Sequence, residues 1–386
     1  MRSLILISLL STSLLLSCNK NDVDGDREQR VYYQPDEFIM GADLSYVNEI
    51  LDHGGVYTDS GEVSDPYGIF SEYGTNVVRL RLFHTPRWTA ELYDGDKMYH
   101  DIEDVKLGIQ RAKDNNMQVL LDFHYSDNWA DPSKQVPPQA WQGLEPAVLG
   151  DSIYNYTFKT LKNLDDAGLM PEYVQVGNEI NPGFVLPHGD RWNKTSQFIE
   201  LINRAVNAVR DAAAGSSTPV KVMLHIAQPE NAGAWLEGLA EQGLADYDFI
   251  GLSYYYQWSD VPPDDLSLHL EELKNEYDKD ILILETAYPW TLENADSYPN
   301  ILDVDELEPH YPATEAGQFK YLKKLVQEIM EGGGKGIFYW EPAWISADIK
   351  TQWGTGSAWD CNALFDFGGE VLQGMDYMTW DYRSLK

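Results

Sequence analysis

The chain has 386 residues, of which 62 are Asp or Glu and 28 are Lys or Arg, so its net charge is −34 at pH 7. A surface this acidic repels phosphate backbones and anionic lipid headgroups, which excludes nucleic acid as an expected partner and argues against a polyanionic substrate. Because 43% of the residues are hydrophobic, the chain can bury a large core, and an α/β barrel of this length forms a single domain.

The first residues have the pattern of a targeting segment. Arg2 precedes an apolar run from Leu4 to Leu16, which is too short to span a bilayer permanently. The run ends in LLSC, which resembles the lipobox of bacterial lipoproteins, in which the cysteine carries lipid and becomes the mature N-terminus. We therefore expect residues 1–17 to be a lipoprotein signal peptide and Cys18 to be lipidated. An ordinary secretory signal with a chance cysteine is the alternative.

Residues 18–37 are polar and acidic after the cysteine, which is typical of a disordered tether. The acidic residues resemble those of lipoproteins displayed on the outer surface of some Gram-negative bacteria. We therefore expect an outer membrane lipoprotein that is exposed at the cell surface and touches the membrane only through its lipid. Cys361 is the only other cysteine, so no intrachain disulfide is expected if Cys18 carries lipid.

From Phe38 onward, short apolar runs alternate with amphipathic patterns. Most runs are nearly continuous in Val, Ile, Leu or Phe, as expected of strands that are buried on both faces. The eight predicted strands are residues 38–45, 76–83, 118–126, 173–179, 221–228, 247–256, 280–288 and 336–344. Apolar residues at helical spacing predict helices at 102–116, 196–213, 234–243, 266–278 and 314–333.

Eight strands that alternate with helices indicate a parallel sheet, and at this length a closed (β/α)8 (TIM) barrel fits best. An open doubly wound sheet is the alternative, but no glycine-rich phosphate loop follows the first strand. Polar residues follow nearly every predicted strand, which indicates functional groups around one barrel mouth. We expect residues 38–386 to form one catalytic domain with extended loops at its C-terminal face, and we expect a monomer.

Two glutamates stand out at the ends of predicted strands. Glu179 and Glu285 are each the first acidic residue after an apolar stretch, on the fourth and seventh strands. Paired carboxylates that flank a scissile bond carry out glycoside hydrolysis, one as acid/base and the other as nucleophile or water activator. A cleft that stacks sugar rings would also account for some of the 12 tryptophans and 24 tyrosines. The alternative is that both glutamates belong to a buried ion-pair network.

Other strand ends complete the predicted site. Arg81 requires a nearby carboxylate, and together with Tyr254 it is predicted to keep Glu285 ionised. His124 and His225 lack the spacing of a metal motif, so we expect them to hydrogen-bond sugar hydroxyls or the glutamates as neutral groups. Polar and aromatic side chains at the same ends are Asp43, Asp127, Trp129, Asn178, Trp340 and Trp344.

Taken together, the strand ends resemble those of the glycoside hydrolase family 53 endo-β-1,4-galactanases. The resemblance is carried by DFHYSDNWADPSKQ (from Asp122), VQVGNE (from Val174), LET (from Leu284) and FYWEPAW (from Phe338). Further matching stretches are GADLSY, VRLRLF, PPQAW, IGLSYY and NALFDF, so the resemblance covers nearly the whole mature chain. It implies endo-hydrolysis of β-1,4-linked galactan with retention of anomeric configuration, without a cofactor.

The resemblance also implies roles for single residues. Glu179 matches the acid/base of the family and Glu285 matches its nucleophile. Asn178 is expected to hydrogen-bond the sugar 2-hydroxyl beside the scissile bond, and Trp340 is expected to be the floor on which the sugar stacks. Sugar-binding roles are further implied for Asp43, His124, Asp127, Trp129, His225, Tyr254 and Trp344.

Some bacterial members of the family bind a structural calcium ion in the loop after the seventh strand. In this chain Asn294, Asp296 and Asn300 offer oxygen ligands there, but Tyr298 stands where the family has histidine. Calcium takes six to eight oxygens, so a site would need help from elsewhere, for example from Asp360. A structural calcium ion is therefore an expectation that rests on an incomplete ligand set.

Two other functions stay open on the sequence. One is a different β-1,4-glycanase of the same clan, such as a glucanase or mannanase. The other is a surface lipoprotein that captures glycan without cutting it, which fits the tether and the aromatic residues but leaves the two strand-end glutamates unexplained.

Overall fold

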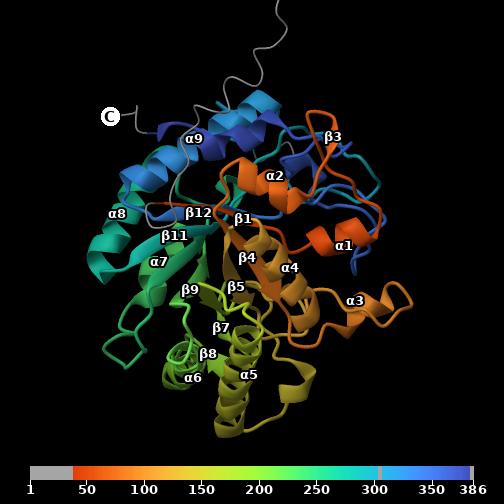
Figure 1. Cartoon of the computed structure of the whole chain (residues 1–386). Coiled ribbons are helices and arrows are strands. Elements are labelled where there is room, and N and C mark those ends of the chain that lie inside the picture. Colours follow the sequence, from red (N-terminus) through yellow and green to blue (C-terminus); the bar gives the residue numbers. More distant parts are fainter. Residues whose placement is uncertain (1–37, 303–306, 383–386) are drawn as a thin grey trace, which may run out of the picture.

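The computed structural model describes residues 38–302 and 307–382, which form a closed barrel of eight parallel strands (Figure 1). Barrel strands that follow one another in the chain are paired, and the first pairs with the last, so the predicted (β/α)8 architecture is confirmed. The strands are β1 (Ile39–Asp43), β4 (Val77–Leu82), β5 (Gln118–Phe123), β6 (Tyr173–Val176), β9 (Lys221–Ala227), β10 (Phe249–Ser253), β11 (Asp280–Glu285) and β12 (Gly336–Tyr339).

Inward side chains fill the barrel in layers that differ in polarity. Toward the N-terminal ends of the strands the interior is apolar, and Gly41 leaves room there for Phe338. A Cβ atom on Gly41 would lie 2.2 Å from the Phe338 ring, so a larger residue would displace that ring. The inward positions nearer the C-terminal ends, such as Arg79 and Asp122, are charged and equally buried. The apolar layer therefore supports a polar layer from below.

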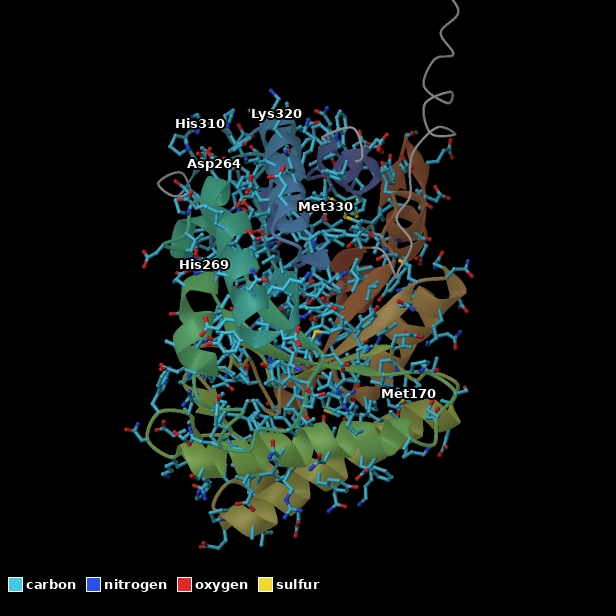
Figure 2. The ribbon with its side chains drawn as sticks, turned by 90° about the vertical axis from the view of Figure 1, so that its left-hand side faces the viewer. Met170, Asp264, His269, His310, Lys320 and Met330 are labelled. Atoms are coloured by element: carbon cyan, nitrogen blue, oxygen red, sulfur yellow. The ribbon has the colours of Figure 1, made fainter. Side chains whose placement is uncertain are left out.

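Helices surround the barrel and bury their apolar faces against the strands (Figure 1). α5 (Pro146–Asp166) packs along α6 (Thr195–Ala213), and α8 (Leu266–Tyr277) packs along α9 (Glu315–Glu331), the helix that carries Lys320 and Met330 in Figure 2. The other helices are α1 (Val47–Asp52), α2 (Pro66–Glu72), α3 (Arg87–Glu91), α4 (Ile102–Asp114) and α7 (Pro229–Leu236). None of the helices in the described ranges is long and apolar enough to cross a bilayer.

The helix predicted at 234–243 is wrong in position. α7 begins at Pro229 and ends at Leu236, because Glu237 is extended (φ −51°, ψ 124°) and Gly238 is left-handed (φ +69°). The sequence also does not predict α5, since β-branched and aromatic residues, which favour strands, interrupt its helical pattern.

The loops at the barrel ends carry short strands and helical turns. The loops after β11 and β12 form one wall of the C-terminal mouth. The loop after β11 is tied to the segment after β12 by backbone hydrogen bonds from Ile301 to Ala358 (3.0 Å) and from Trp290 to Cys361 (2.8 Å). The short elements are β2 (Thr58–Asp59), β3 (Glu62–Val63), β7 (Gly183–Phe184), β8 (Gly189–Asp190), η2 (Gln139–Trp141), η3 (Tyr256–Trp258), η4 (Pro263–Asp265), η6 (Asp360–Asn362) and η7 (Gln373–Thr379).

Candidate active site

A cavity of about 340 Å³ opens at the C-terminal mouth of the barrel. Eight of the residues that the sequence predicts for the site line it: Arg81, His124, Trp129, Asn178, Glu179, Glu285, Trp340 and Trp344. The lining also contains residues that the sequence analysis does not select, chiefly Tyr46, Arg79, Tyr255, Trp258, Tyr298, Trp353 and Trp359.

Glu179 stands in a strained turn directly after β6. Gly177 has φ +78° and Glu179 has φ +46°, a left-handed conformation that costs a non-glycine residue roughly 1–2 kcal/mol. The side-chain amide of Gln135 donates hydrogen bonds to the carbonyl groups of Asn178 (2.7 Å) and Glu179 (3.2 Å). These bonds hold the turn in place, and the turn presents Glu179 to the cavity.

A β-bulge turns Glu285 into the cavity. Leu284 packs inside the barrel and Ile283 packs outside it, so regular alternation along β11 would turn Glu285 outward. The pairing between β10 and β11 skips one residue, because Leu252 is opposite Ile283 whereas Ser253 is opposite Glu285. Bulges of this kind redirect a side chain next to active sites. Two consecutive residues of β11 therefore face inward.

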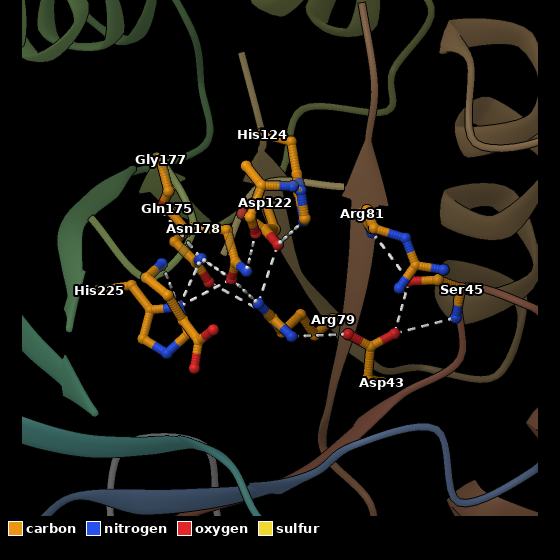
Figure 3. A network of polar contacts seen from close by, with 12 residues as sticks. Asp43, Ser45, Arg79, Arg81, Asp122, His124, Gln175, Gly177, Asn178 and His225 are labelled. Carbon is orange, nitrogen blue, oxygen red and sulfur yellow. Dashed lines mark hydrogen bonds and ion pairs between the residues drawn. The ribbon is translucent and has the colours of Figure 1, made fainter. Parts of the chain in front are cut away.

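Arg79, and not Arg81, pairs with Glu285. The Arg79 guanidinium lies 2.9 Å from Glu285 Oε1. It also lies 2.8 Å from a carboxylate oxygen of both Asp43 and Asp122, as Figure 3 shows. The predicted contact between Arg81 and Glu285 is wrong because Arg79, two residues deeper on the same face of β4, is the arginine that reaches this level of the barrel. One buried cation is thus shared by three carboxylates.

Arg81 pairs with a different carboxylate, as its burial requires. Its Nη1 atom is 3.0 Å from Glu341 Oε1, and both side chains are buried. The guanidinium also faces the rings of Trp129 and Tyr46, at 4.0 and 5.0 Å from their centroids. Arg81 therefore supports an aromatic wall of the cavity and not the nucleophile candidate.

Tyr255, and not Tyr254, contacts Glu285. The Tyr255 hydroxyl donates to Glu285 Oε2 at 3.2 Å, whereas the Tyr254 hydroxyl donates to the Val261 carbonyl at 2.9 Å. Alternation along β10 places Tyr255 on the face of Ser253 and Tyr254 on the opposite face. The prediction for Tyr254 is wrong by one residue. The alternation of side chains along the strand is the sequence signal that identifies Tyr255 instead.

Three other predicted residues do not line the cavity. Asp43 and His225 are fully buried beneath it, where Asp43 binds Arg79 and the Nδ1 atom of His225 lies 2.9 Å from Asn178 Oδ1. Asp127 accepts hydrogen bonds from two backbone N–H groups of neighbouring loops, at 2.9 and 2.8 Å. Asp43 and His225 therefore orient residues of the cavity, and Asp127 organises a loop beside it.

His124 and Asn178 line the cavity in fixed orientations. The Nε2 atom of His124 is 3.0 Å from Asp122, its Nδ1 atom accepts the Ala130 N–H, and burial lowers the pKa of the ring, so the imidazole is neutral. The oxygen of Asn178 accepts from Arg79 at 2.8 Å, and its amide nitrogen donates to the Ala130 carbonyl at 2.9 Å. The second N–H of the Asn178 amide has no acceptor among the described residues and is left for another one.

The two cavity glutamates have different electrostatic surroundings. Burial, followed by the negative charge of Glu285, raises the pKa of Glu179 to about 8. Burial also raises the pKa of Glu285, but the Arg79 guanidinium opposes this effect and the value is about 7. The ion pair with Arg79 therefore favours the charged form of Glu285, and the charge on Glu285 favours the protonated form of Glu179, which is the division between a carboxylate and a carboxylic acid that paired chemistry requires.

Aromatic rings form the walls of the cavity. Trp340 lies 4.7 Å from Trp359 and 6.2 Å from Trp129 between ring centroids. At the rim, the side chains of Trp353 and Trp258 are 63% and 46% exposed. Flat apolar ring faces of this kind pack against the apolar face of a sugar.

The described part of the loop after β11 does not have the donor set of a calcium site. The carboxylate of Asp296 accepts from Ser346 Oγ and two backbone N–H groups, and Asn300 directs its amide N–H toward Asp360 at 2.8 Å. The Asn294 amide likewise donates to a backbone carbonyl. Within residues 38–302 and 307–382, no group of three or more Asp, Glu, His or Cys side chains is placed to hold a metal ion. The expectation of calcium is therefore not supported.

The barrel and its paired strand-end glutamates define a (β/α)8 glycoside hydrolase. The sequence profile of glycosyl hydrolase family 53 matches residues 39–378, and the chain belongs to this family.

Relatives and solved structures agree with this assignment. The chain is 43% identical over 365 residues to an arabinogalactan endo-beta-1,4-galactanase of Cellvibrio japonicus, covering 93% of this chain and 92% of that protein. It is 33% identical to an endo-beta-1,4-galactanase of Bacillus subtilis, covering 89% and 86%. The GH53 catalytic domain of Ignisphaera aggregans superposes with a TM-score of 0.82 at 35% identity, covering 89% of this chain and 96% of that one.

Proposed function

We propose that the protein hydrolyses internal β-1,4-galactosidic linkages of galactan and arabinogalactan. The observation that carries the proposal is the presence of Glu179 and Glu285 in one cavity, in a chain that is 43% identical to an arabinogalactan endo-β-1,4-galactanase. A net charge of −34 also favours a neutral polysaccharide over a polyanionic one.

Glu285 acts as the nucleophile in this proposal. Arg79 and Tyr255 both donate hydrogen bonds to its carboxylate, which stabilises the charged form that attacks the anomeric carbon. Glu179 remains protonated at a higher pH and gives its proton to the departing glycosidic oxygen. The products of the first step are a shortened galactan chain and a covalent glycosyl-enzyme ester on Glu285.

Water resolves the ester in the second step. Glu179, now a carboxylate, takes a proton from the water as it attacks the anomeric carbon, and Glu285 is released. Each step inverts the anomeric carbon, so the product keeps the β configuration. Trp340 provides the stacking surface for the sugar, and the free N–H of Asn178 is available for the 2-hydroxyl.

A time course of products from linear galactan, cellulose and mannan tests substrate and endo action together. We expect galactan alone to yield a ladder of oligomers early in the reaction. Oligomers only from cellulose or mannan would assign a different glycanase of the clan. Binding to galactan without products would assign glycan capture.

Variants of the two glutamates test their roles separately. We expect Glu179→Ala to lower kcat on galactan by about 100- to 10,000-fold, and azide to restore turnover of an activated aryl galactoside as a β-galactosyl azide. With azide, Glu285→Ala should give only the α-galactosyl azide, because azide then takes the place of the missing carboxylate and inverts the anomeric carbon once. Glu241→Gln, at an exposed position outside the cavity, is the matched control and should retain the parent rate. A Glu285→Ala protein with the parent rate would contradict the nucleophile assignment.

We also propose that the protein is a cell-surface lipoprotein that carries lipid on Cys18 and is anchored in an outer membrane.

 This proposal rests on the LLSC motif and the acidic residues that follow it, which lie outside the described residues. In cells fed a palmitate label, Cys18→Ala should lose the label and leave the membrane fraction, whereas Cys361→Ala should keep it. Protease treatment of intact cells then tests surface exposure, since a protein that faces the periplasm is protected.

A further inference from the structure

This inference rests on the proposed function, because it concerns how Glu179 holds the proton that it transfers. The Ser253 hydroxyl is 2.6 Å from Glu179 Oε1, and His225 Nε2 is 2.9 Å from the same hydroxyl. Ser253 and His225 are fully buried and do not line the cavity. The three side chains therefore form a hydrogen-bonded chain that runs from the cavity into the barrel.

The partners of His225 Nδ1 determine which ring nitrogen carries the proton. The backbone N–H of Glu179 donates to Nδ1 at 3.4 Å, and Gln175 Nε2 lies 3.0 Å from it. Arg79, which can only donate, binds Gln175 Oε1 at 3.1 Å, so Gln175 presents its NH2 group to the ring (Figure 3). Burial lowers the pKa of His225, and the neutral ring has a single N–H. That N–H is on Nε2 and points to Ser253.

Asn178 does not require the ring proton. Its Oδ1 atom lies 2.9 Å from His225 Nδ1, but it already accepts from Arg79 Nη2 at 2.8 Å and from Gln175 Nε2 at 3.1 Å. With the proton on Nδ1 instead, the Glu179 backbone N–H would lose the acceptor that it has in the described part of the chain. With the proton on Nε2, the Glu179 backbone N–H keeps its acceptor, and Asn178 Oδ1 keeps its two donors.

The donor-to-acceptor direction of the hydrogen bonds from His225 through Ser253 determines which oxygen of Glu179 is bound. Because Nε2–H of His225 donates to Ser253 Oγ, the hydroxyl hydrogen of Ser253 is free to donate to Glu179 Oε1. Among residues 38–302 and 307–382, Ser253 is the only side chain that hydrogen-bonds the Glu179 carboxyl group. Oε2 is therefore the oxygen that is left for the substrate.

We propose that Ser253 and His225 are positioning residues that keep the transferable proton of Glu179 on Oε2. In the first step the Oε2–H bond breaks, the proton passes to the glycosidic oxygen, and the bond from that oxygen to the anomeric carbon breaks. In the second step Oε2 takes a proton from the attacking water. Oε1 accepts from Ser253 throughout, so the carboxyl group serves both steps without turning.

The test compares Ser253→Ala on two substrates. On galactan, whose leaving group needs a proton, kcat/KM should fall by about 10- to 100-fold. On a dinitrophenyl galactobioside, whose leaving group needs none, kcat/KM should stay within about 3-fold of the parent, because the first step no longer uses the acid. The basic limb of the galactan pH profile should move to higher pH, since the Ser253 hydrogen bond lowers the pKa of Glu179.

Thr286→Val is the matched control, because it also removes a buried hydroxyl beside the cavity, one that has no hydrogen-bond partner in the described residues. It should change neither the substrate ratio nor the basic limb. Equal losses on both substrates with an unmoved basic limb would show a purely structural role for Ser253 and overturn the proposal. Parent rates on both substrates would overturn it as well. If Ser253→Ala does not fold, His225→Gln is measured in its place.

A titration without substrate separates this proposal from the proposed function. In protein labelled with 13C at the glutamate carboxyl carbon, the signal that Glu179→Gln removes reports the protonation of Glu179. Its midpoint should move to higher pH in Ser253→Ala and stay in place in Thr286→Val. An unmoved midpoint overturns the positioning role, whereas a parent protein that leaves galactan intact overturns only the proposed substrate.

Discussion

Buried Arg79 lies within 2.9 Å of three carboxylates, of which only Glu285 lines the cavity. Asp43 and Asp122 hold the guanidinium from below, and their two negative charges exceed its single positive charge, so they raise the pKa of Glu285 while Arg79 lowers it. Because a buried ion pair depends on all its partners, the state of Glu285 is set by side chains that the substrate does not reach. The ionisation of the nucleophile is thus a property of this cluster.

The pH dependence of activity tests that cluster. For the parent, kcat/KM should be bell-shaped, with an acid limb from protonation of Glu285 and a basic limb from loss of the Glu179 proton. Arg79→Lys removes the planar fork and weakens the ion pair, so the pKa of Glu285 rises and the acid limb moves to higher pH. Arg81→Lys is the matched control, because Arg81 pairs with Glu341. An acid limb that moves only in Arg81→Lys would contradict the assignment.

Two adjacent tyrosines provide a second test. Tyr255→Phe removes a hydrogen bond to the Glu285 carboxylate, which is worth about 1.5–3 kcal/mol, so kcat should fall by about 10- to 100-fold. Tyr254→Phe removes a bond to the Val261 carbonyl outside the cavity and should leave kcat within about 3-fold of the parent. Steady-state kinetics on galactan measures both, and the reverse order of effects would restore the prediction made from sequence.

The loops after β11 and β12 are the elements that complete the cavity wall. They bring Tyr298, Ile301 and Trp353 to the cavity, and Ser346 joins them by donating to Asp296 in one loop and by lying 3.2 Å from Asp360 in the other. Hydrogen-bond donors thus occupy the carboxylates that a calcium ion would need. The wall is held by side-chain and backbone hydrogen bonds.

Removal of the Ser346 hydroxyl tests this account. Ser346→Ala should lower the free energy of unfolding by about 1–3 kcal/mol, because the carboxylate of Asp296 loses a donor. Ser152→Ala, at a partly exposed position of α5, should change it by less than about 0.5 kcal/mol. Thermal unfolding of the parent should be the same in EDTA and in calcium. A melting temperature that EDTA lowers and calcium restores would contradict the hydrogen-bonded wall.

For the whole molecule, the barrel places the two glutamates on strands that are three steps apart around its mouth. A retaining mechanism needs their carboxyl groups about 5–5.5 Å apart, so that Glu285 attacks directly with no water between it and the sugar. This geometry sets the stereochemistry of the product.

Proton NMR of the first product formed from galactan measures that stereochemistry. We expect the new reducing ends to appear as the β-anomer and to change to the equilibrium mixture only later, by mutarotation. The Glu241→Gln variant should give the same anomer, because its side chain is outside the cavity. The α-anomer as first product would show inversion and would require a wider carboxylate pair.

The sequence by itself determined the eight barrel strands, their order and the two glutamates at the ends of the fourth and seventh. These features follow from local patterns, because a doubly buried strand is an apolar run and a strand-end carboxylate follows it directly. The sequence likewise identified eight of the twenty residues that line the cavity.

Only the tertiary structure decided which side chains meet. Glu285 contacts Arg79 and not Arg81, and it contacts Tyr255 and not Tyr254. The depth of a side chain in the barrel and the direction in which it points depend on the register between strands that are distant in the chain. The inward turn of Glu285 depends on a bulge, which no alternation pattern shows. The hydrogen bond from Ser346 to Asp296 joins two loops about fifty residues apart, and pairings over such distances exist only once the barrel has closed.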